Sequence, residues 1–504
     1  MSENDEFADE RTRLIPNLSS TARYDNQNES TMGEASTSGR KLPQYIAALA
    51  ATGGALAAGT ILGWTAPAEG QLVKDDLTDS HYDFSVSKEE FSWIGAFVTL
   101  GAAFICIPVG FLAGLFGRKM TMLGLVIPFT VGWALMLFAT NVTMMYVGRF
   151  MLGVAGGAFC VTAPMYTGEI AQNEVRGTLG TFFQLMITIG ILFVYAVGAG
   201  VSVFYLNLIC GIIPLVFGLV FFFMPESPTF YVSKGRHDDA LNALKRLRGE
   251  NYNCNAELEE LKREAQTVES NSTNLGQALM RIESLRSAFI AIGLMFFQQM
   301  SGINAVIFYQ TRIFKASGSS IDPQLSTIIV GIIQVVATFI SSIIVDKLGR
   351  RLLLLLSIVL MGICLAGLGI FFNLKDNEDA VVESLHWLPV TSLCIFIIAF
   401  SLGFGPVPWL MAGELFAPDI KGFLGAIAGT FNWLLAFVIT KFFANFQEAL
   451  GNGPTFYLFT AFCVLGFLFV IFFVPETKGK SFQAIQDQIK FQCIQIRDYQ
   501  AAAN

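Results

Sequence analysis

The sequence predicts an all-α membrane protein in which twelve transmembrane helices form two repeats of six, with a cytosolic helical linker between them. Hydrophobic residues make up 53% of the 504 residues and charged residues only 14%, which is too apolar for a soluble protein. Windows of about 20 apolar residues, long enough to cross a ~30 Å hydrocarbon layer, recur along most of the chain. Short motifs of the first half also return in the second.

Twelve apolar windows define the expected spans. They cover 44–66, 92–112, 120–139, 144–168, 177–199, 203–224, 287–310, 325–346, 352–373, 388–412, 424–446 and 455–474. The first forty residues are polar and rich in Ser, Asn and Glu, which indicates disorder and not a cleavable signal. We therefore expect a disordered N-terminus (1–43), a six-helix half (44–224), a linker (225–286), a second half (287–474) and a C-terminal tail (475–504).

Charge placement predicts the orientation, because short cytoplasmic loops carry an excess of Lys and Arg. The basic residues near Arg118, Arg176, Lys347 and Arg350 all fall on one side of the twelve-span count. The opposite loops are acidic. Both termini and the linker should therefore lie in the cytosol, where the leucines of "DDALNALKRLRG" recur at helical spacing and predict helices that do not cross the membrane.

An internal repeat relates the two halves. "GEIAQNEVRG" at 168–177 matches "GELFAPDIKG" at 413–422, 245 positions later. "FGRK" after the second span likewise matches "LGRR" after the eighth, and "PESP" after the sixth matches "PETKG" after the twelfth. Because six is even, the halves should insert the same way round, as in carriers that hold their substrate between parallel repeats near the membrane midplane.

Charged residues of these repeats fall at the cytoplasmic ends of spans. They are Arg118, Glu169, Arg176 and Glu226 in the first half and Asp346, Arg350, Glu414, Lys421 and Glu476 in the second. Ion pairs among them would latch the inner mouth, because such interfaces are bistable. The alternative is that the charges only orient the loops. Acids at this depth add cost without helping orientation, which favours the latch.

Amides interrupt the seventh span in the stretch "QQMSGINAVIFYQ", residues 298–310. An unpaired amide in an apolar medium costs on the order of 4–8 kcal/mol on the harshest transfer scale, so these amides need other helices or a ligand as partners. On a straight helix Asn304 would point about 140° away from Gln299. Either the amides flank a ligand at different depths, or the segment bends, for which Ser301 and Gly302 are the candidates.

Three further features concern the spans themselves. Gly405, Pro406 and Pro408 should break the tenth span just before its Trp and make it a candidate moving gate. Trp64 is expected at the outer membrane interface. Lys441, inside the eleventh span, is expected to extend its ammonium to the interface.

Together these motifs resemble the sugar porter family of the major facilitator superfamily. The resemblance rests on "GRK", "GRF", "PMYTGE", "PESP", "QQMSGINAVIFY", "DKLGRR", "GPVPW", "ELF" and "PETKG", which follow in order from about 117 to 479. "LGFGPVPWL" and "FNWLLAFVITKFF" are most similar to insect facilitated trehalose transporters and related mammalian hexose facilitators. The chain departs from the family pattern at Gly114, Leu115 and Thr229, which implies a different latch in the first half.

The resemblance implies a sugar site. Its residues would be Gln184, Gln298, Gln299, Asn304, Gln334, Trp409 and Asn432. Amides both donate and accept hydrogen bonds and so suit a ring of hydroxyls, while an indole suits the flatter face of a sugar. The alternative is that the amides join helices to one another. Of the amides in 298–310, Gln310 is the least expected to touch a ligand.

The implied function is facilitative (uniport) transport of a hexose or of trehalose by alternating access. A proton-coupled symporter is the main alternative, but Thr65 stands where such family members carry an acid. A sugar sensor is a second alternative, although the chain ends about thirty residues after Pro475. We expect no enzyme, since the three His residues lie in predicted loops and no span contains a nucleophile with a base. We also expect no metal, no cofactor and, because no basic patch suggests one, no nucleic-acid partner.

The sequence also suggests where the protein resides. We expect the lipid bilayer of the plasma membrane, with an additional endosomal or lysosomal pool. That pool is inferred from "ERTRLI", in which Glu10, Leu14 and Ile15 fit an acidic dileucine-type signal that a clathrin adaptor would recognise.

Overall fold

The computed structural model describes residues 39–73, 81–270, 275–318, 322–378, 380–417, 420–480 and 484–489, without the side chains of Asn173, 267–270, Leu275, Asp346 and Ala380. Glu10, Leu14 and Ile15 of the sorting motif lie outside this description. The regular elements within it are helices, and twelve helical segments are long and apolar enough to cross a membrane. The predicted all-α class and number of spans are confirmed.

Six spans precede the linker helices and six follow them. The first six are α1 (Leu42–Gly63) with α2 (Thr65–Leu72), α3 (Lys88–Phe116), α4 (Arg118–Gly124) with α5 (Val126–Leu137), α6 (Val142–Ile170), α7 (Asn173–Gly198) and α8 (Val203–Phe222). The last six are α13 (Ile282–Met300) with α14 (Ile303–Ser317), α15 (Pro323–Leu348), α16 (Arg350–Asp376), α17 (Leu388–Leu402) with α18 (Val407–Leu415), α19 (Lys421–Leu450) and α20 (Asn452–Phe473).

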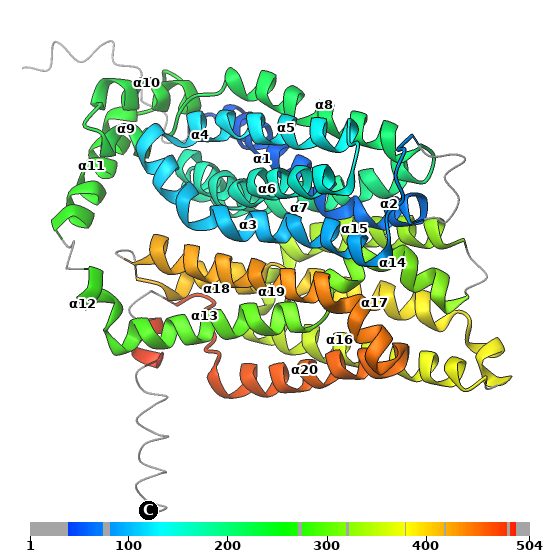
Figure 1. The fold of residues 1–504 in the computed structure, drawn as a ribbon. Coiled ribbons are helices and arrows are strands. Elements are labelled where there is room, and N and C mark those ends of the chain that lie inside the picture. The colour runs from blue at the N-terminus through cyan, green and yellow to red at the C-terminus, as the bar shows by residue number, and fades with distance from the viewer. Residues whose placement is uncertain are drawn as a thin grey trace, which may run out of the picture.

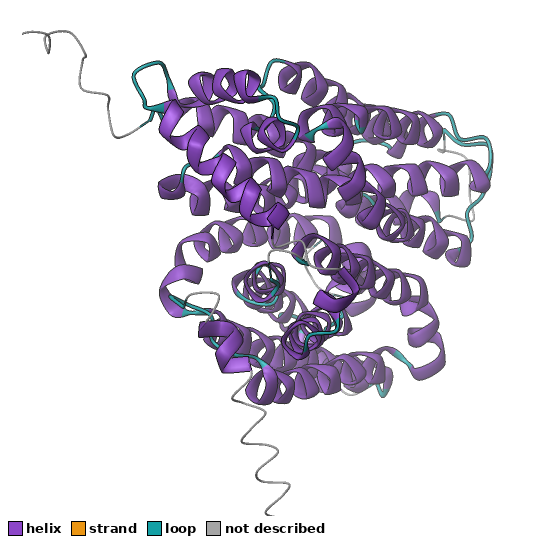
Figure 2. Ribbon diagram, turned by 90° about the vertical axis from the view of Figure 1, so that its left-hand side faces the viewer, coloured by secondary structure: helices purple, strands orange, loops and turns teal. Residues whose placement is uncertain are grey.

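Between the halves run four shorter helices, α9 (Pro228–Ser233), α10 (His237–Arg248), α11 (Cys254–Ser270) and α12 (Leu275–Leu279), and a short 3₁₀ helix, η1 (Ala380–Leu385), precedes α17. The two sets of spans form two layers, and α9–α12 gather at one end of both (Figure 1). Figure 2 looks onto that end, with the halves one above the other. We call it the linker end, and the opposite end, where α2 and α14 lie, the far end.

Two of the spans break where the sequence predicts a bend. In the seventh, Gly302 has a φ of +79° and separates α13 from α14, while the Ser301 Oγ donates to the Gln298 carbonyl at 2.6 Å. In the tenth, α17 ends at Leu402 and α18 begins at Val407, because Pro406 and Pro408 cannot donate backbone hydrogen bonds. Both breaks expose backbone groups inside the bundle.

Close helix packing depends on small residues in α6. A Cβ added to Gly153 would lie 2.0 Å from the Val98 carbonyl oxygen, and one added to Gly157 would lie 2.5 Å from the Ala102 Cα. Any larger side chain would therefore push α3 away from α6. This is the small-residue contact that lets membrane helices gain dispersion energy in the absence of a hydrophobic driving force.

Two sequence expectations about the spans are wrong. Trp64 does not reach the outer interface: it is fully buried, its Nε1 donates to the Asn207 Oδ1 at 2.7 Å, and the Arg149 guanidinium lies 4.8 Å from its ring. Lys441 does not extend to the interface either, because it is only 2% exposed. In both cases the polar partner of the side chain is a group on another helix of the bundle.

Candidate functional site

A chain of amides crosses the second half beside the break in the seventh span. Asn304, at the beginning of α14, donates through Nδ2 to the Gln299 Oε1 at the end of α13. Gln299 donates in turn through Nε2 to the Asn432 Oδ1 on α19 at 2.9 Å. The break at Gly302 thus brings Asn304 beside Gln299, which a straight helix would not do. These three predicted site residues lie together.

Gln298 extends this chain of amides, but its side chain is hydrogen-bonded to other protein groups. Its Nε2 donates to the carbonyls of Phe404 (2.6 Å) and Gly405 (3.0 Å), which the break in the tenth span has freed, and its Oε1 accepts from the Asn432 Nδ2 at 2.7 Å. An amide offers two N–H donors, and both are used here. Gln298 therefore satisfies the break between α17 and α18 and has no donor left for a ligand.

The other three predicted site residues approach from other helices. Gln334 on α15 is buried and Gln184 on α7 is half-buried, and no hydrogen bond among the described residues uses either amide. α7 and α15 belong to opposite halves and pack against each other. The Trp409 side chain is 39% exposed, and its ring faces Gly429, one turn before Asn432 on α19. The Trp409 ring thus lies near the amide chain, and the amides of Gln184 and Gln334 lie on two helices that pack across the two halves.

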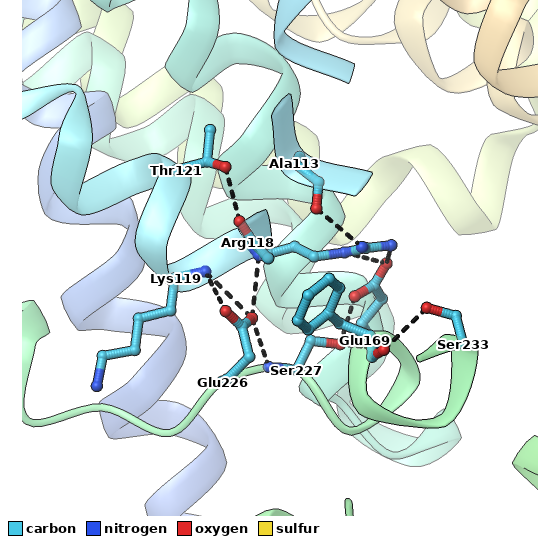
Figure 3. A network of polar contacts seen from close by, with 10 residues as sticks. Ala113, Arg118, Lys119, Thr121, Glu169, Glu226, Ser227 and Ser233 are labelled. Atoms are coloured by element: carbon cyan, nitrogen blue, oxygen red, sulfur yellow. Dashed lines mark hydrogen bonds and ion pairs between the residues drawn. The ribbon is translucent and has the colours of Figure 1, made fainter. Parts of the chain in front are cut away.

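A charge network lies at the linker end of the first half (Figure 3). The Arg118 guanidinium pairs with the Glu169 carboxylate at 2.7 Å and also donates to the Ala113 carbonyl at 3.1 Å. The Glu226 carboxylate accepts the backbone N–H groups of Arg118 (3.1 Å) and Lys119 (3.0 Å) at the beginning of α4. The Ser227 hydroxyl donates to Glu169 and joins the two carboxylates into one network.

The second half repeats this geometry. Arg350 pairs with Glu414 at 3.0 Å, and Glu476 accepts the backbone N–H of Arg350 at 3.0 Å and of Arg351 at 3.0 Å. The Thr477 hydroxyl takes the place of the serine and donates to Glu414. An acid at the beginning of a helix is favoured because the first N–H groups lack helical partners.

Three predicted members stand outside these pairs. Arg176 donates to the Ala171 carbonyl at 3.4 Å, and Lys421 has its ammonium near Gly413. Neither joins an ion pair among the described residues. The side chain of Asp346 lies outside the described part. Within it, the ion pairs of Arg118 and Arg350 link helices of the same half, so they do not tie the two halves together.

The two equivalent carboxylates of these networks differ electrostatically. Burial raises the pKa of Glu226 above its ordinary value, although three backbone N–H groups and Arg118 act to lower it. Burial also acts to raise the pKa of Glu476, but the N–H groups of Lys478, Arg350, Arg351 and Thr477 together outweigh it and hold this pKa low. The two halves therefore share a geometry but not a charge balance.

Two ion pairs that sequence reasoning missed join the halves at the far end. The Lys441 Nζ on α19 donates to the Glu89 carboxylate on α3 at 2.6 Å and to the Ser92 Oγ at 3.0 Å. Glu69 on α2 faces Arg312 on α14, with 3.7 Å between carboxylate and guanidinium. The sequence contained two signals for these ion pairs: a lysine inside an apolar span, and acids at the beginning or end of other spans.

Comparison with solved structures supports the fold. The structure of the proton:xylose symporter XylE bound to 6-bromo-6-deoxy-D-glucose matches with a TM-score of 0.71 and 25% sequence identity, over 88% of this chain and 98% of that one. A partially occluded inward open conformation of the xylose transporter XylE from E. coli matches with a TM-score of 0.72 and 24% identity, over 87% and 99% of the two chains.

Sequence comparison identifies the family. Facilitated trehalose transporters Tret1 of Culex quinquefasciatus and Bombyx mori are 39% and 40% identical over 92% and 88% of this chain and 88% and 86% of their own length. The Tret1 of Anopheles gambiae is 40% identical over 88% of this chain, which spans about half (55%) of that relative. The family model for sugar (and other) transporters matches residues 43–488. This multi-pass membrane protein therefore belongs to the sugar transporter family.

Proposed function

We propose that this chain is a facilitative carrier that moves a hexose or trehalose across a membrane by alternating access. The observation that carries the proposal is the chain of amides at the break in the seventh span, next to an open indole. A neutral, hydroxyl-rich ligand needs groups that both donate and accept, and it needs no fixed charge. Trehalose is included because relatives about 40% identical carry the name of trehalose transporters.

The site residues divide by role. Gln299, Asn304 and Asn432 would bind sugar hydroxyls by exchanging their mutual hydrogen bonds for bonds to the ligand. Gln334, Gln184 and Trp409 would complete the site with their uncommitted amides and ring. Gln298 would instead support the site, because its donors hold the break in the tenth span. A tenth span that bends at this break would then move when the sugar leaves.

Alternating access follows from the different bonding at the two ends. At the far end, Lys441–Glu89 and Arg312–Glu69 join the halves. At the linker end, Arg118–Glu169 and Arg350–Glu414 each stay within one half. We assign this arrangement to the state closed at the far end. The cationic linker end would face the cytosol and the far end the outside of the plasma membrane.

Purified protein in liposomes tests the substrate and the mechanism together. Vesicles preloaded with unlabelled sugar should accumulate labelled glucose or trehalose by counterflow, at a rate that does not change when a pH gradient is imposed. Labelled xylitol, which lacks a ring, is the matched control and should not accumulate. Absence of counterflow with every sugar would refute the carrier.

Proton-coupled symport remains the second candidate because of Glu69. This carboxylate lies one helical turn beyond Thr65 on α2, and its Oε2 is buried without a hydrogen-bond partner among the described residues. The first span thus does contain an ionisable group near the expected place. Uphill sugar uptake driven by an inward proton gradient, abolished in Glu69→Gln, would establish symport in place of uniport.

A further inference from the structure

We propose that the linker end of the first half binds the headgroup of an anionic membrane lipid, in a basic cavity between the beginning of α1 and the end of α10. The cavity has a volume of about 290 Å³ and is lined by Arg40, Pro43, Lys245, Arg246, Gly249, Glu250 and Asn251. Three cations therefore share it with one carboxylate. A phosphate-bearing headgroup is the chemistry that such a surplus of donors fits.

The geometry of this cavity is held by the backbone. The Arg40 N–H donates to the Arg248 carbonyl at 2.7 Å, which attaches the beginning of α1 to the end of α10. Gly249 follows α10 with a φ of +89°, and the Arg40 side chain passes so close that a Cβ added there would lie 3.1 Å from its Cδ. The turn after α10 thus sets the Arg40 guanidinium beside Lys245 and Arg246.

Within the described part of the chain, no salt bridge involves the cations that line the cavity. Arg248, in the same basic run, is buried and bonds the Glu257 carboxylate at 2.7 Å and the Ile170 carbonyl at 2.7 Å. Arg40 and Lys245 are exposed, and neither enters an ion pair among the described residues. One arginine of this segment therefore stabilises the linker, while the positive charges around the cavity stay available.

Apolar side chains adjoin the cavity where acyl chains would lie. Leu42 on α1 is 70% exposed and Phe223 after α8 is 60% exposed, as is usual for surfaces that face lipid. The Arg246 guanidinium donates to the Phe223 carbonyl, and the Lys119 ammonium lies 5.5 Å from the Phe222 ring. These cations therefore lie at the ends of helices with exposed apolar side chains, where we expect a headgroup to lie.

This arrangement favours a lipid over a soluble phosphate. A lipid would gain both the charge interaction and the apolar contact with α1 and α8, and an anionic leaflet concentrates such headgroups beside the protein. A bound headgroup would bridge α1 to α10 and so hold the linker against the first half. The proposal uses the cytosolic orientation of the proposed function only to name the leaflet, since binding itself does not depend on sugar transport.

Native mass spectrometry of the full-length protein in detergent tests the site. We expect phosphatidylserine to bind at least about tenfold more tightly than phosphatidylcholine. The triple variant Arg40→Gln, Lys245→Gln, Arg246→Gln should lose this preference. The double variant Arg40→Gln, Lys245→Gln leaves the bond from Arg246 to Phe223 in place. It should still lose most of the preference for phosphatidylserine, and such a loss excludes unfolding as the cause.

A matched control removes three cations from the linker end of the other half. Lys347→Gln, Lys478→Gln, Lys480→Gln changes the net charge equally and should keep the preference for phosphatidylserine. Equal preference in the cavity variants and this control would overturn the proposal. Glycerophosphoserine or inorganic phosphate binding as tightly as the lipid would also overturn it, because the site would then take a soluble anion.

Discussion

Glu226 and Glu476 show how equivalent residues of a repeat acquire different properties. Each carboxylate accepts backbone N–H groups at the beginning of a helix, but burial prevails at Glu226 and hydrogen bonding prevails at Glu476. A raised folded pKa means that protonation stabilises the fold, so the contribution of Glu226 falls as pH rises from 4.5 through the folded pKa. A lowered pKa means that the contribution of Glu476 is present above 4.5 and is lost as pH falls through the folded pKa.

This contrast gives the first prediction. At pH 7, Glu476→Gln should lower the free energy of unfolding by about 1 kcal/mol, a modest value because this carboxylate is partly exposed. Glu226→Gln should leave the stability unchanged or raise it slightly, since burial opposes the charged form of this carboxylate and the amide is uncharged. Thermal unfolding in detergent between pH 4 and 7 measures both. The free energies of unfolding of the two variants should become more alike as the pH falls towards 4. Equal losses of stability at pH 7 would contradict the different pKa shifts of the two carboxylates.

The second prediction concerns two glutamines of the same span. Gln299→Met preserves the size of the side chain but leaves Asn304 and Asn432 without their partner, so transport should fall at least about tenfold. Gln310→Met is the matched control, because Gln310 bonds the Thr327 carbonyl at 3.4 Å and takes no part in the amide chain. The prediction is tested by comparing the counterflow rates of the two variants, normalised to the amount of folded protein. Similar rates in the two variants would remove Gln299 from the site.

At the scale of residues, candidate site residues came from the sequence, and their hydrogen-bond partners came from the structure. Gln299 and Asn304 could be found from the sequence because they are polar residues inside an apolar span, whereas Asn432 was implied only by the family resemblance. Which amide bonds which depends on the angle between helices. The sequence therefore could not separate Gln298, whose donors hold a backbone break, from Gln299 next to it.

At the scale of elements, the break in the seventh span depends on Gly302. Its φ of +79° disfavours any residue with a Cβ, and an added Cβ would lie 2.9 Å from the Phe459 ring. Gly302→Ala should cost about 1–3 kcal/mol of stability and misplace Asn304 relative to Gln299. Thermal unfolding and sugar binding report the two effects.

Gly276 is the matched control for this substitution. It lies in α12, has no neighbour within 4 Å of an added Cβ, and is in a helix, where alanine is preferred. Gly276→Ala should keep full stability and binding. A Gly302→Ala protein as stable and as active as Gly276→Ala would show that the bend does not need glycine.

At the scale of the whole molecule, the ion pair between Lys441 and Glu89 should hold the far end closed. Lys441→Met removes a buried charge and frees an exposed carboxylate, so the state open at the far end should gain population without loss of folded protein. Glu89→Gln instead leaves a buried ammonium without its counter-charge, held by the Ser92 hydroxyl and the Trp93 ring, and should be the more destabilising change.

At the far end, Glu89, Ala444 and Glu448 line a cavity of about 480 Å³. Labelling of a cysteine placed at Ala444 measures the shift. A membrane-impermeant thiol reagent should react severalfold faster in Lys441→Met than in the parent. Glu448→Gln, which changes a carboxylate lining the same cavity, should leave the rate unchanged. The exchange Glu89→Lys with Lys441→Glu should restore slow labelling. Unaltered labelling in Lys441→Met would show that the ion pair between Lys441 and Glu89 does not hold the far end closed.

The sequence by itself determined the number of spans and the break in the tenth span, and it offered a bend at Gly302 as one of two alternatives. These are local properties, because span length follows from the thickness of the hydrocarbon layer and a bend follows from residues within one turn. Only the tertiary structure decided the partners. Glu169 bonds Arg118 and not Arg176, and Lys441 reaches Glu89, 352 positions away. A buried charge is stabilised by whichever opposite charge the packing brings within a few ångströms, and that distance is set by the arrangement of the helices.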